Sequence, residues 1–151
     1  MQAHEIMITE VYTVNENDLV RSVIKKFIKY RISGIPITNS KNQIVAYVSD
    51  GDIMRYIGKH ENLVVDFLYY VSAAKGDDDE FEDRLQKILN LNIMDIAQRK
   101  VIKVNMNEDI ENVASILAKK SIKKLPVEHN GVLVGIISRG DVIRNCFKSI
   151  L

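Results

Sequence analysis

The sequence predicts an α+β fold: two β-α-β-β-α units that pack on a shared core as one pseudo-twofold module, with a helical insertion between them. Three observations lead to this prediction. The chain repeats itself, each copy has the same order of helical and strand patterns, and one copy is too small to bury its own apolar sheet face. With 151 residues, 46% hydrophobic and 27% charged, the chain has a globular composition, not a disordered or coiled-coil one.

The internal repeat is fixed by the two prolines, Pro36 and Pro126. Residues 11–37 align without a gap on residues 101–127, and the apolar positions of the two copies coincide. We therefore treat the copies as two versions of one structural unit.

Each copy predicts an amphipathic helix ahead of its proline. In the first copy, apolar residues recur between positions 20 and 28 at i, i+3, i+4, i+7 and i+8, which marks one helical stripe. We expect this helix to begin near Asp18 and its counterpart near Asp109, because aspartate is a favourable N-cap residue.

Each proline enters a predicted β-hairpin. Asn130-Gly131 lies between two apolar segments, and both residues tolerate the positive φ that a two-residue turn needs. Residues 40–42 form a turn one residue longer in the first copy. Each hairpin ends at a serine that opens another helix, within the tetrads Ser-Asp-Gly-Asp at 49–52 and Ser-Arg-Gly-Asp at 138–141.

The insertion separates the two copies. The predicted boundaries are 1–59 for the first unit, 60–91 for the insertion and 92–151 for the second unit. Residues 62–71 fit a helix or a strand, and residues 75–79 predict a loop leading into a helix. The apolar stripe of that helix is Phe81, Leu85, Ile88 and Leu89. Two interpretations stay open: a packed insertion with a solvated acidic face, or an element that contacts a partner or a second copy.

The repeated S-x-x-D tetrads allow two readings. A serine followed three residues later by an acid is a capping box, which stabilises a helix start by about 1 kcal/mol. The same parts suit a nucleotide, because a helix N-terminus attracts phosphate and a carboxylate accepts hydrogen bonds from ribose hydroxyls. Both readings can hold together.

Basic residues distinguish the two copies. Lys123 and Lys124 precede the second proline, where the first copy has Ser33 and Gly34. Arg139 aligns with an aspartate of the first tetrad. We therefore expect the second copy to gather three cations in one phosphate-binding cleft. The alternative is that the two lysines only solvate an exposed segment.

Little in the sequence favours catalysis. His4, His60 and His129 are scattered and have no metal-ligand spacing, so we expect no metal site and no enzyme. The single cysteine, Cys146, excludes an internal disulfide and fits a reducing compartment.

Membrane and nucleic-acid binding are also disfavoured. The N-terminus lacks the features of a signal peptide, and no apolar run approaches the roughly 20 residues needed to span a bilayer. A net charge of +1 and the absence of basic residues around Tyr69 and Tyr70 disfavour nucleic acid. We expect a cytoplasmic protein.

The paired pattern resembles a tandem CBS domain pair, the Bateman module. The motifs that carry the resemblance are Ile6-Met7 and Ile93-Met94, the V-x-x-V segments at 11–14 and 101–104, the two prolines and the two S-x-x-D tetrads. The resemblance implies a disc with two clefts and a regulatory function. It also implies an adenosine-containing ligand such as AMP, ADP, ATP, S-adenosylmethionine or cyclic di-AMP, no required cofactor, and a homodimer.

The resemblance also implies which residues bind the ligand. The hydroxyl and ribose positions of the family fall on Ser49, Asp52, Ser138 and Asp141, and the residues before the prolines on Ser33, Gly34, Lys123 and Lys124. The positions lining the base fall near Tyr12, Thr13, Ile102 and Lys103. In this family one ligand can contact both copies, so a phosphate held by the first copy can reach the lysines of the second.

Two functions are consistent with these patterns. One is a ligand sensor whose state is read by an effector protein or through self-association. The other is a ligand-free dimerisation or protein-interaction scaffold. If the cations gather in the second cleft, we expect loss of Asp141 to weaken phosphate-bearing ligands more than loss of Asp52.

Overall fold

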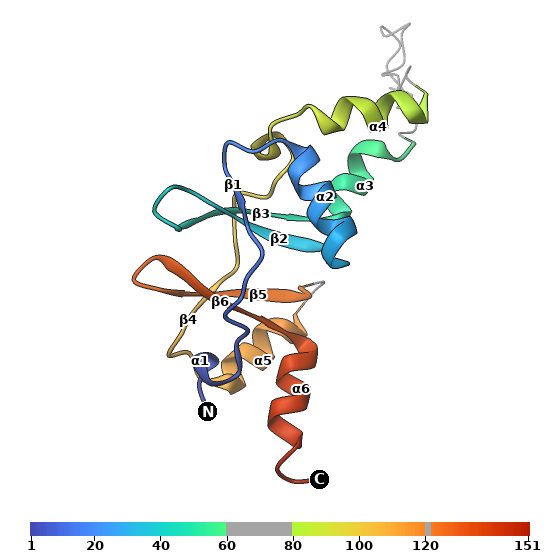
Figure 1. Cartoon of the computed structure of the whole chain (residues 1–151). Coiled ribbons are helices and arrows are strands. Elements are labelled where there is room, and N and C mark those ends of the chain that lie inside the picture. The colour runs from blue at the N-terminus through green and yellow to red at the C-terminus, as the bar shows by residue number, and fades with distance from the viewer. Residues whose placement is uncertain (60–79, 120–121) are drawn as a thin grey trace, which may run out of the picture.

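A computed structural model describes residues 1–59, 80–119 and 122–151 of the chain (Figure 1). The first unit consists of β1 (Val14–Asn15), α2 (Val20–Tyr30), β2 (Gly34–Thr38), β3 (Ile44–Ser49) and α3 (Asp50–Ile57). The second consists of β4 (Val104–Asn105), α5 (Ile110–Ala118), β5 (Lys124–His129), β6 (Val132–Ser138) and α6 (Arg139–Phe147). The predicted β-α-β-β-α order is confirmed in both units.

Each unit carries a three-stranded sheet of the same topology. The orders are β1-β2-β3 and β4-β5-β6, with the first pair parallel and the second pair antiparallel. In register, Gly34 lies opposite Ser49, and Lys124 lies opposite Ser138. The sheet therefore brings the residues before each proline next to the serine of the tetrad in the same unit.

The predicted hairpin turns are present. Asn130 and Gly131 have φ angles of 52° and 79°, as the two-residue turn requires, and Asn42 has a φ of 57° in the longer turn. The two hairpins lie one above the other and point to the same side of the molecule, with α2, α3 and α6 on the opposite side (Figure 1).

One of the two predicted N-cap residues, Asp18, needs correction. Helix α2 begins at Val20, and its N-cap residue is Leu19, whose side chain accepts no hydrogen bond. Asp18 instead accepts a hydrogen bond from the backbone N–H of Asn15 at 2.8 Å and so stabilises the preceding turn. Asp109 does occupy the N-cap position of α5, but its side chain makes no capping hydrogen bond.

The apolar interior also differs from the expected shared core, because it forms two clusters. One lies in each unit, and each is completed by a segment that precedes the other unit in the sequence. Ile88 and Ile93, from α4 (Phe81–Leu89) and the 3-10 helix η1 (Ile93–Asp95), pack into the first cluster. Ala3 and Ile6, from α1 (Ala3–Ile6), pack into the second (Figure 1).

Backbone hydrogen bonds show which positions of these two core-completing segments are equivalent. Ala3 N–H donates to the Glu108 carbonyl, and Ile93 N–H donates to the Asp18 carbonyl, both at 2.9 Å. Ala3 and Ile93 are therefore counterparts. The two Ile-Met pairs quoted for the resemblance do not occupy equivalent positions.

The described part of the insertion is packed. Ile88 is buried on α4, and Arg84 donates from Nε to the Ile57 carbonyl at the end of α3 at 3.0 Å. Glu82 and Asp83 are exposed. The predicted helix with a solvated acidic face is present, but Phe81 of its predicted apolar stripe is 46% exposed. The predictions for 62–71 and 75–79 fall outside the described residues.

The two units meet along a seam of reciprocal contacts. Tyr47 of β3 exchanges two backbone hydrogen bonds of 2.9 Å with Gln98. At the matching position of the other unit, Ile136 of β6 makes the same kind of pair with Ile8. Each hairpin is therefore bound by the segment that leads into the other unit.

Candidate functional site

A cavity of about 430 Å³ lies at this seam. This is within the range of small-molecule pockets, roughly 300–1,000 Å³. Both units contribute to it. The residues that line it are Ser33, Gly34, Tyr47, Ser49, Asp50, Gly51, Asp52 and Arg55 from the first unit, and Gln98, Lys100, Val101, Ile102, Ile122, Lys123, Lys124 and Pro126 from the segment before and within the second. We call this cavity the inter-unit cleft.

The tetrad in this cleft forms a complete capping box at the start of α3. Asp52 Oδ2 accepts hydrogen bonds from the Ser49 backbone N–H at 2.8 Å and from its hydroxyl at 3.3 Å. The structural reading of the tetrad is therefore correct. It does not exclude ligand binding, because the same residues also line the cleft.

The Asp52 carboxylate has two further partners, both at Oδ1. Arg55 forms an ion pair with it from the next turn of α3. Gln98 Nε2 donates to it at 2.9 Å from the segment that leads into the second unit. Asp52 lines the cleft but is only 3% exposed, so little of its carboxylate is open to it.

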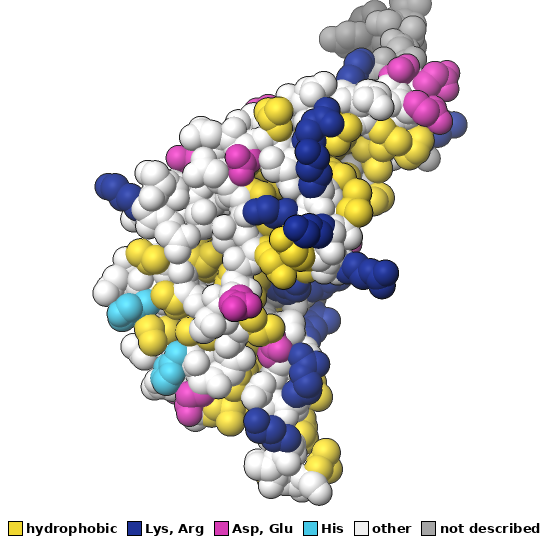
Figure 2. All heavy atoms as spheres, viewed as in Figure 1, with side chains coloured by type: hydrophobic (Ala, Val, Ile, Leu, Met, Phe, Trp, Pro, Cys, Tyr) yellow, Lys and Arg dark blue, Asp and Glu magenta, His cyan; other side chains and the backbone are white. Residues whose placement is uncertain are grey.

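The charge of the cleft is mainly positive. Among the described residues, four cationic ones line it, against two acidic ones, Asp50 and Asp52. The cations are Arg55, Lys100, Lys123 and Lys124. Figure 2 shows Lys and Arg side chains along the helical side of the molecule and across the seam. Such a lining favours an anionic ligand.

The expected gathering of three cations in one cleft is wrong. Arg139 lines a separate cavity of about 300 Å³ between α5 and α6. Its Nε donates to the Leu117 carbonyl at 2.8 Å, near the C-terminal end of α5, where the helix dipole favours a cation. Lys123 and Lys124 instead face the tetrad of the first unit, because the two units pack with the start of β5 beside that tetrad.

The second tetrad is also a complete capping box. Asp141 Oδ2 accepts from the Ser138 N–H and hydroxyl, each at 2.8 Å, and Oδ1 accepts from Arg144 at 2.8 Å. Neither Ser138 nor Asp141 lines the inter-unit cleft. The structure thus separates the two predicted sugar-binding carboxylates.

Three of the remaining predicted residues also lie outside the inter-unit cleft. Tyr12 stacks on Tyr30 with ring centroids 3.9 Å apart. The Thr13 carbonyl accepts a hydrogen bond from Lys26, and Lys103 Nζ lies 3.0 Å from Glu128 Oε2. Of the thirteen predicted residues, the structure brings together Ser33, Gly34, Ser49, Asp52, Ile102, Lys123 and Lys124.

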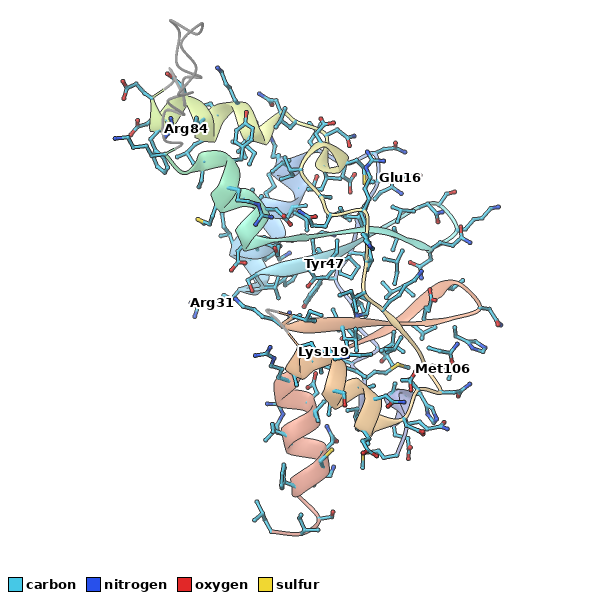
Figure 3. The ribbon with its side chains drawn as sticks, turned by 180° about the vertical axis from the view of Figure 1, so that it is seen from behind. Glu16, Arg31, Tyr47, Arg84, Met106 and Lys119 are labelled. Atoms are coloured by element: carbon cyan, nitrogen blue, oxygen red, sulfur yellow. The ribbon has the colours of Figure 1, made fainter. Side chains whose placement is uncertain are left out.

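Several residues that line the cleft were not among those predicted from the sequence. Tyr47 lies at the seam between the sheets (Figure 3). Burial, helped by the nearby negative charge of Asp50, raises its pKa to about 12. Arg55 had a detectable signal, since arginine follows the tetrad aspartate by three residues in both copies. No sequence signal pointed to Gln98, because its partner Asp52 is 46 residues away in the sequence.

The described residues contain no group of three or more His, Cys, Asp or Glu side chains that could hold a metal ion. Among the same residues, no helix is both long and apolar enough to cross a membrane. The polar side chains that line the inter-unit cleft carry hydroxyl, carboxylate, amide and cationic groups.

Comparison with known proteins gives a consistent result. The family model "CBS domain" matches residues 3–59 and 93–148. The uncharacterized protein MJ1426 of Methanocaldococcus jannaschii is 32% identical over 95% of this chain and 89% of its own length. The chain spans only 58% of another relative, the chloroplastic CBS domain-containing protein CBSX1 of Arabidopsis thaliana, at 26% identity.

Solved structures share the fold. The crystal structure of CBSX2 in complex with AMP covers 99% of this chain and 98% of its own, with a TM-score of 0.74 and 19% identity. Protein MJ1225 of Methanocaldococcus jannaschii, described as a putative archaeal homolog of γ-AMPK, covers 96% of this chain and 47% of its own, with a TM-score of 0.75 and 17% identity. Two family matches over more than half of the sequence decide the assignment: the chain belongs to the CBS domain family and carries two such domains in tandem.

Proposed function

We propose that this tandem CBS pair is a non-catalytic regulatory module that binds an adenosine-containing ligand in the inter-unit cleft. The observation that carries the proposal is the joining of Ser49 and Asp52 from one unit with Lys123 and Lys124 from the other around one cavity. A carboxylate suits the sugar hydroxyls, and the lysines suit phosphate. One ligand with both groups would connect the two units.

The likeness to known structures supports the ligand class. CBSX2, whose fold this chain shares, has been crystallised with AMP. AMP, ADP, ATP, S-adenosylmethionine and cyclic di-AMP are the candidates. The four cations that line the cleft favour the phosphate-bearing members of this group.

Self-association is the second part of the proposal. Met54 on α3 and Ile143 on α6 occupy equivalent positions of the two units, and their exposed fractions are 58% and 57%. Two matched apolar side chains on the outer helices suit contact with a second copy. We propose a homodimer through this helical face, with an effector protein reading its state.

The alternative function is a ligand-free scaffold. The exposed helical face supports it because self-association needs no ligand, and the two capping boxes support it because they alone account for both tetrads. Self-association does not distinguish the two functions, whereas ligand binding does. A cytoplasmic location stays a prediction from the sequence.

A thermal-shift screen with AMP, ATP, S-adenosylmethionine and cyclic di-AMP tests the sensor function. A ligand at 100 times its Kd stabilises the folded state by about 2.7 kcal/mol. The matched variants are Asp52→Asn and Asp141→Asn, which remove the charge and keep an oxygen to accept from the capping serine. Because the lysines lie with Asp52, we expect Asp52→Asn to lose most of the shift and Asp141→Asn to keep it.

This order reverses the one expected from the sequence. Far-UV circular dichroism and the ligand-free Tm establish that both variants are folded. The absence of a shift with all four compounds on the wild-type chain would leave only the scaffold. Equal losses in the two variants would contradict the assignment of the ligand to the inter-unit cleft.

A further inference from the structure

Asp52 has hydrogen-bond donors at all of its acceptor positions. An ionised carboxylate offers about four lone-pair sites. Oδ2 accepts from the backbone and hydroxyl of Ser49, and Oδ1 accepts from Arg55 and Gln98. Sugar hydroxyls therefore bind this carboxylate only in exchange for donors that are already present.

Gln98 is the donor most easily exchanged. The Ser49 N–H and hydroxyl both belong to the capping box, and the Arg55 guanidinium is a charged partner, whose hydrogen bond is roughly twice as strong as that of a neutral group. Gln98 is neutral and exposed, so its amide can be solvated when it leaves. Its backbone stays paired with Tyr47 whichever way the side chain turns.

In the second unit, the described residues include no donor equivalent to the Gln98 side chain. Its counterpart of the Tyr47–Gln98 pair is Ile136 with Ile8, and isoleucine has no side-chain N–H. Among the described residues, Asp141 accepts side-chain hydrogen bonds from Arg144 and from the Ser138 hydroxyl. Among the described residues, a side-chain amide that donates to the tetrad aspartate is thus found only in the inter-unit cleft, where Gln98 donates to Asp52.

We infer that Gln98 sets the ligand affinity of the inter-unit cleft by competing with the ligand's sugar hydroxyls for Asp52. The inference rests on the proposed function, since it needs a ligand with a sugar diol.

Isothermal titration of wild type and Gln98→Ala with AMP tests this role. We expect the Kd for AMP to fall by about three- to tenfold in Gln98→Ala, since one competing hydrogen bond is removed. The analogue 2′,3′-dideoxy-AMP lacks the hydroxyls, so its Kd should be the same for both proteins. Ile8→Ala, at the matching position, is the control and should leave the AMP affinity unchanged.

The possible outcomes are distinct. If AMP binds wild type but binds Gln98→Ala equally or more weakly, the inference is overturned and the proposed function stands. The same holds if AMP and the dideoxy analogue gain by the same factor. If neither protein binds AMP, ADP, ATP, S-adenosylmethionine or cyclic di-AMP, the proposed function fails and the inference fails with it.

Discussion

The hydroxyl of Tyr47 occupies the space that a side chain at position 34 would need. A Cβ built on Gly34 would overlap this oxygen and would lie only 3.0–3.1 Å from two ring carbons. The absence of a side chain at Gly34 therefore lets the tyrosine ring lie across the strand and line the inter-unit cleft. In the second unit the equivalent pair is Lys124 with Ile136, so this arrangement belongs to the first unit alone.

Gly34→Ala should destabilise the fold by about 1–3 kcal/mol, because it overpacks a site that cannot expand without moving Tyr47. The free energy of unfolding in urea measures the effect. Tyr47→Ile, which installs the residue found in the second unit, should recover most of the loss in the double variant. A Gly34→Ala protein as stable as wild type would show that the ring moves aside at no cost.

The raised pKa of Tyr47 predicts a loss of stability in alkali. Its folded value of about 12 exceeds the unfolded value of 10, so its contribution is complete below pH 10 and is lost as the pH rises to 12. The difference between these two pKa values corresponds to roughly 2–3 kcal/mol in the free energy of unfolding. Urea unfolding at pH 9 and pH 11.5 should show a steeper loss for wild type than for Tyr47→Phe. Parallel losses would contradict the buried, neutral phenol.

The lysines predict how affinity depends on phosphate. Replacing Lys123 and Lys124 with methionine should weaken ATP by about 10- to 100-fold, because charge-assisted hydrogen bonds to phosphate are lost. Adenosine should change little. The control is Lys41→Met with Lys148→Met, which alters the net charge equally at residues that do not line the cleft. An equal effect of the two pairs would indicate long-range attraction in place of contact.

The helical face predicts how oligomerisation responds to mutation. Met54→Glu combined with Ile143→Glu should shift a dimer to monomers, because a charge then replaces apolar contact at both equivalent positions. Sedimentation velocity gives the molecular mass directly. Lys41→Glu on the hairpin turn is the control. A dimer that withstands the double substitution would place the interface elsewhere.

Local structure followed from the sequence because its signals are short-range. The positive φ of Asn130 and Gly131, and both capping boxes, depend on neighbours within a few residues, so each could be predicted from its own segment. The duplicated pattern then specified two units with one topology. Even the error at Asp18 was local, a displacement of one residue in the start of α2.

The composition of the cleft was decided by tertiary structure. Lys123, Lys124 and Arg139 belong to one repeat of the sequence. In the folded chain, however, the two lysines line the cleft that Asp52 also lines, whereas Arg139 donates to a carbonyl near the C-terminal end of α5. The cause is that each unit pairs with the segment leading into the other, as Tyr47 does with Gln98. Such contacts join residues far apart in the sequence, 51 positions for Tyr47 and Gln98 and 128 for Ile8 and Ile136. They are made by backbone groups that every residue carries, so no pattern of side chains predicts them.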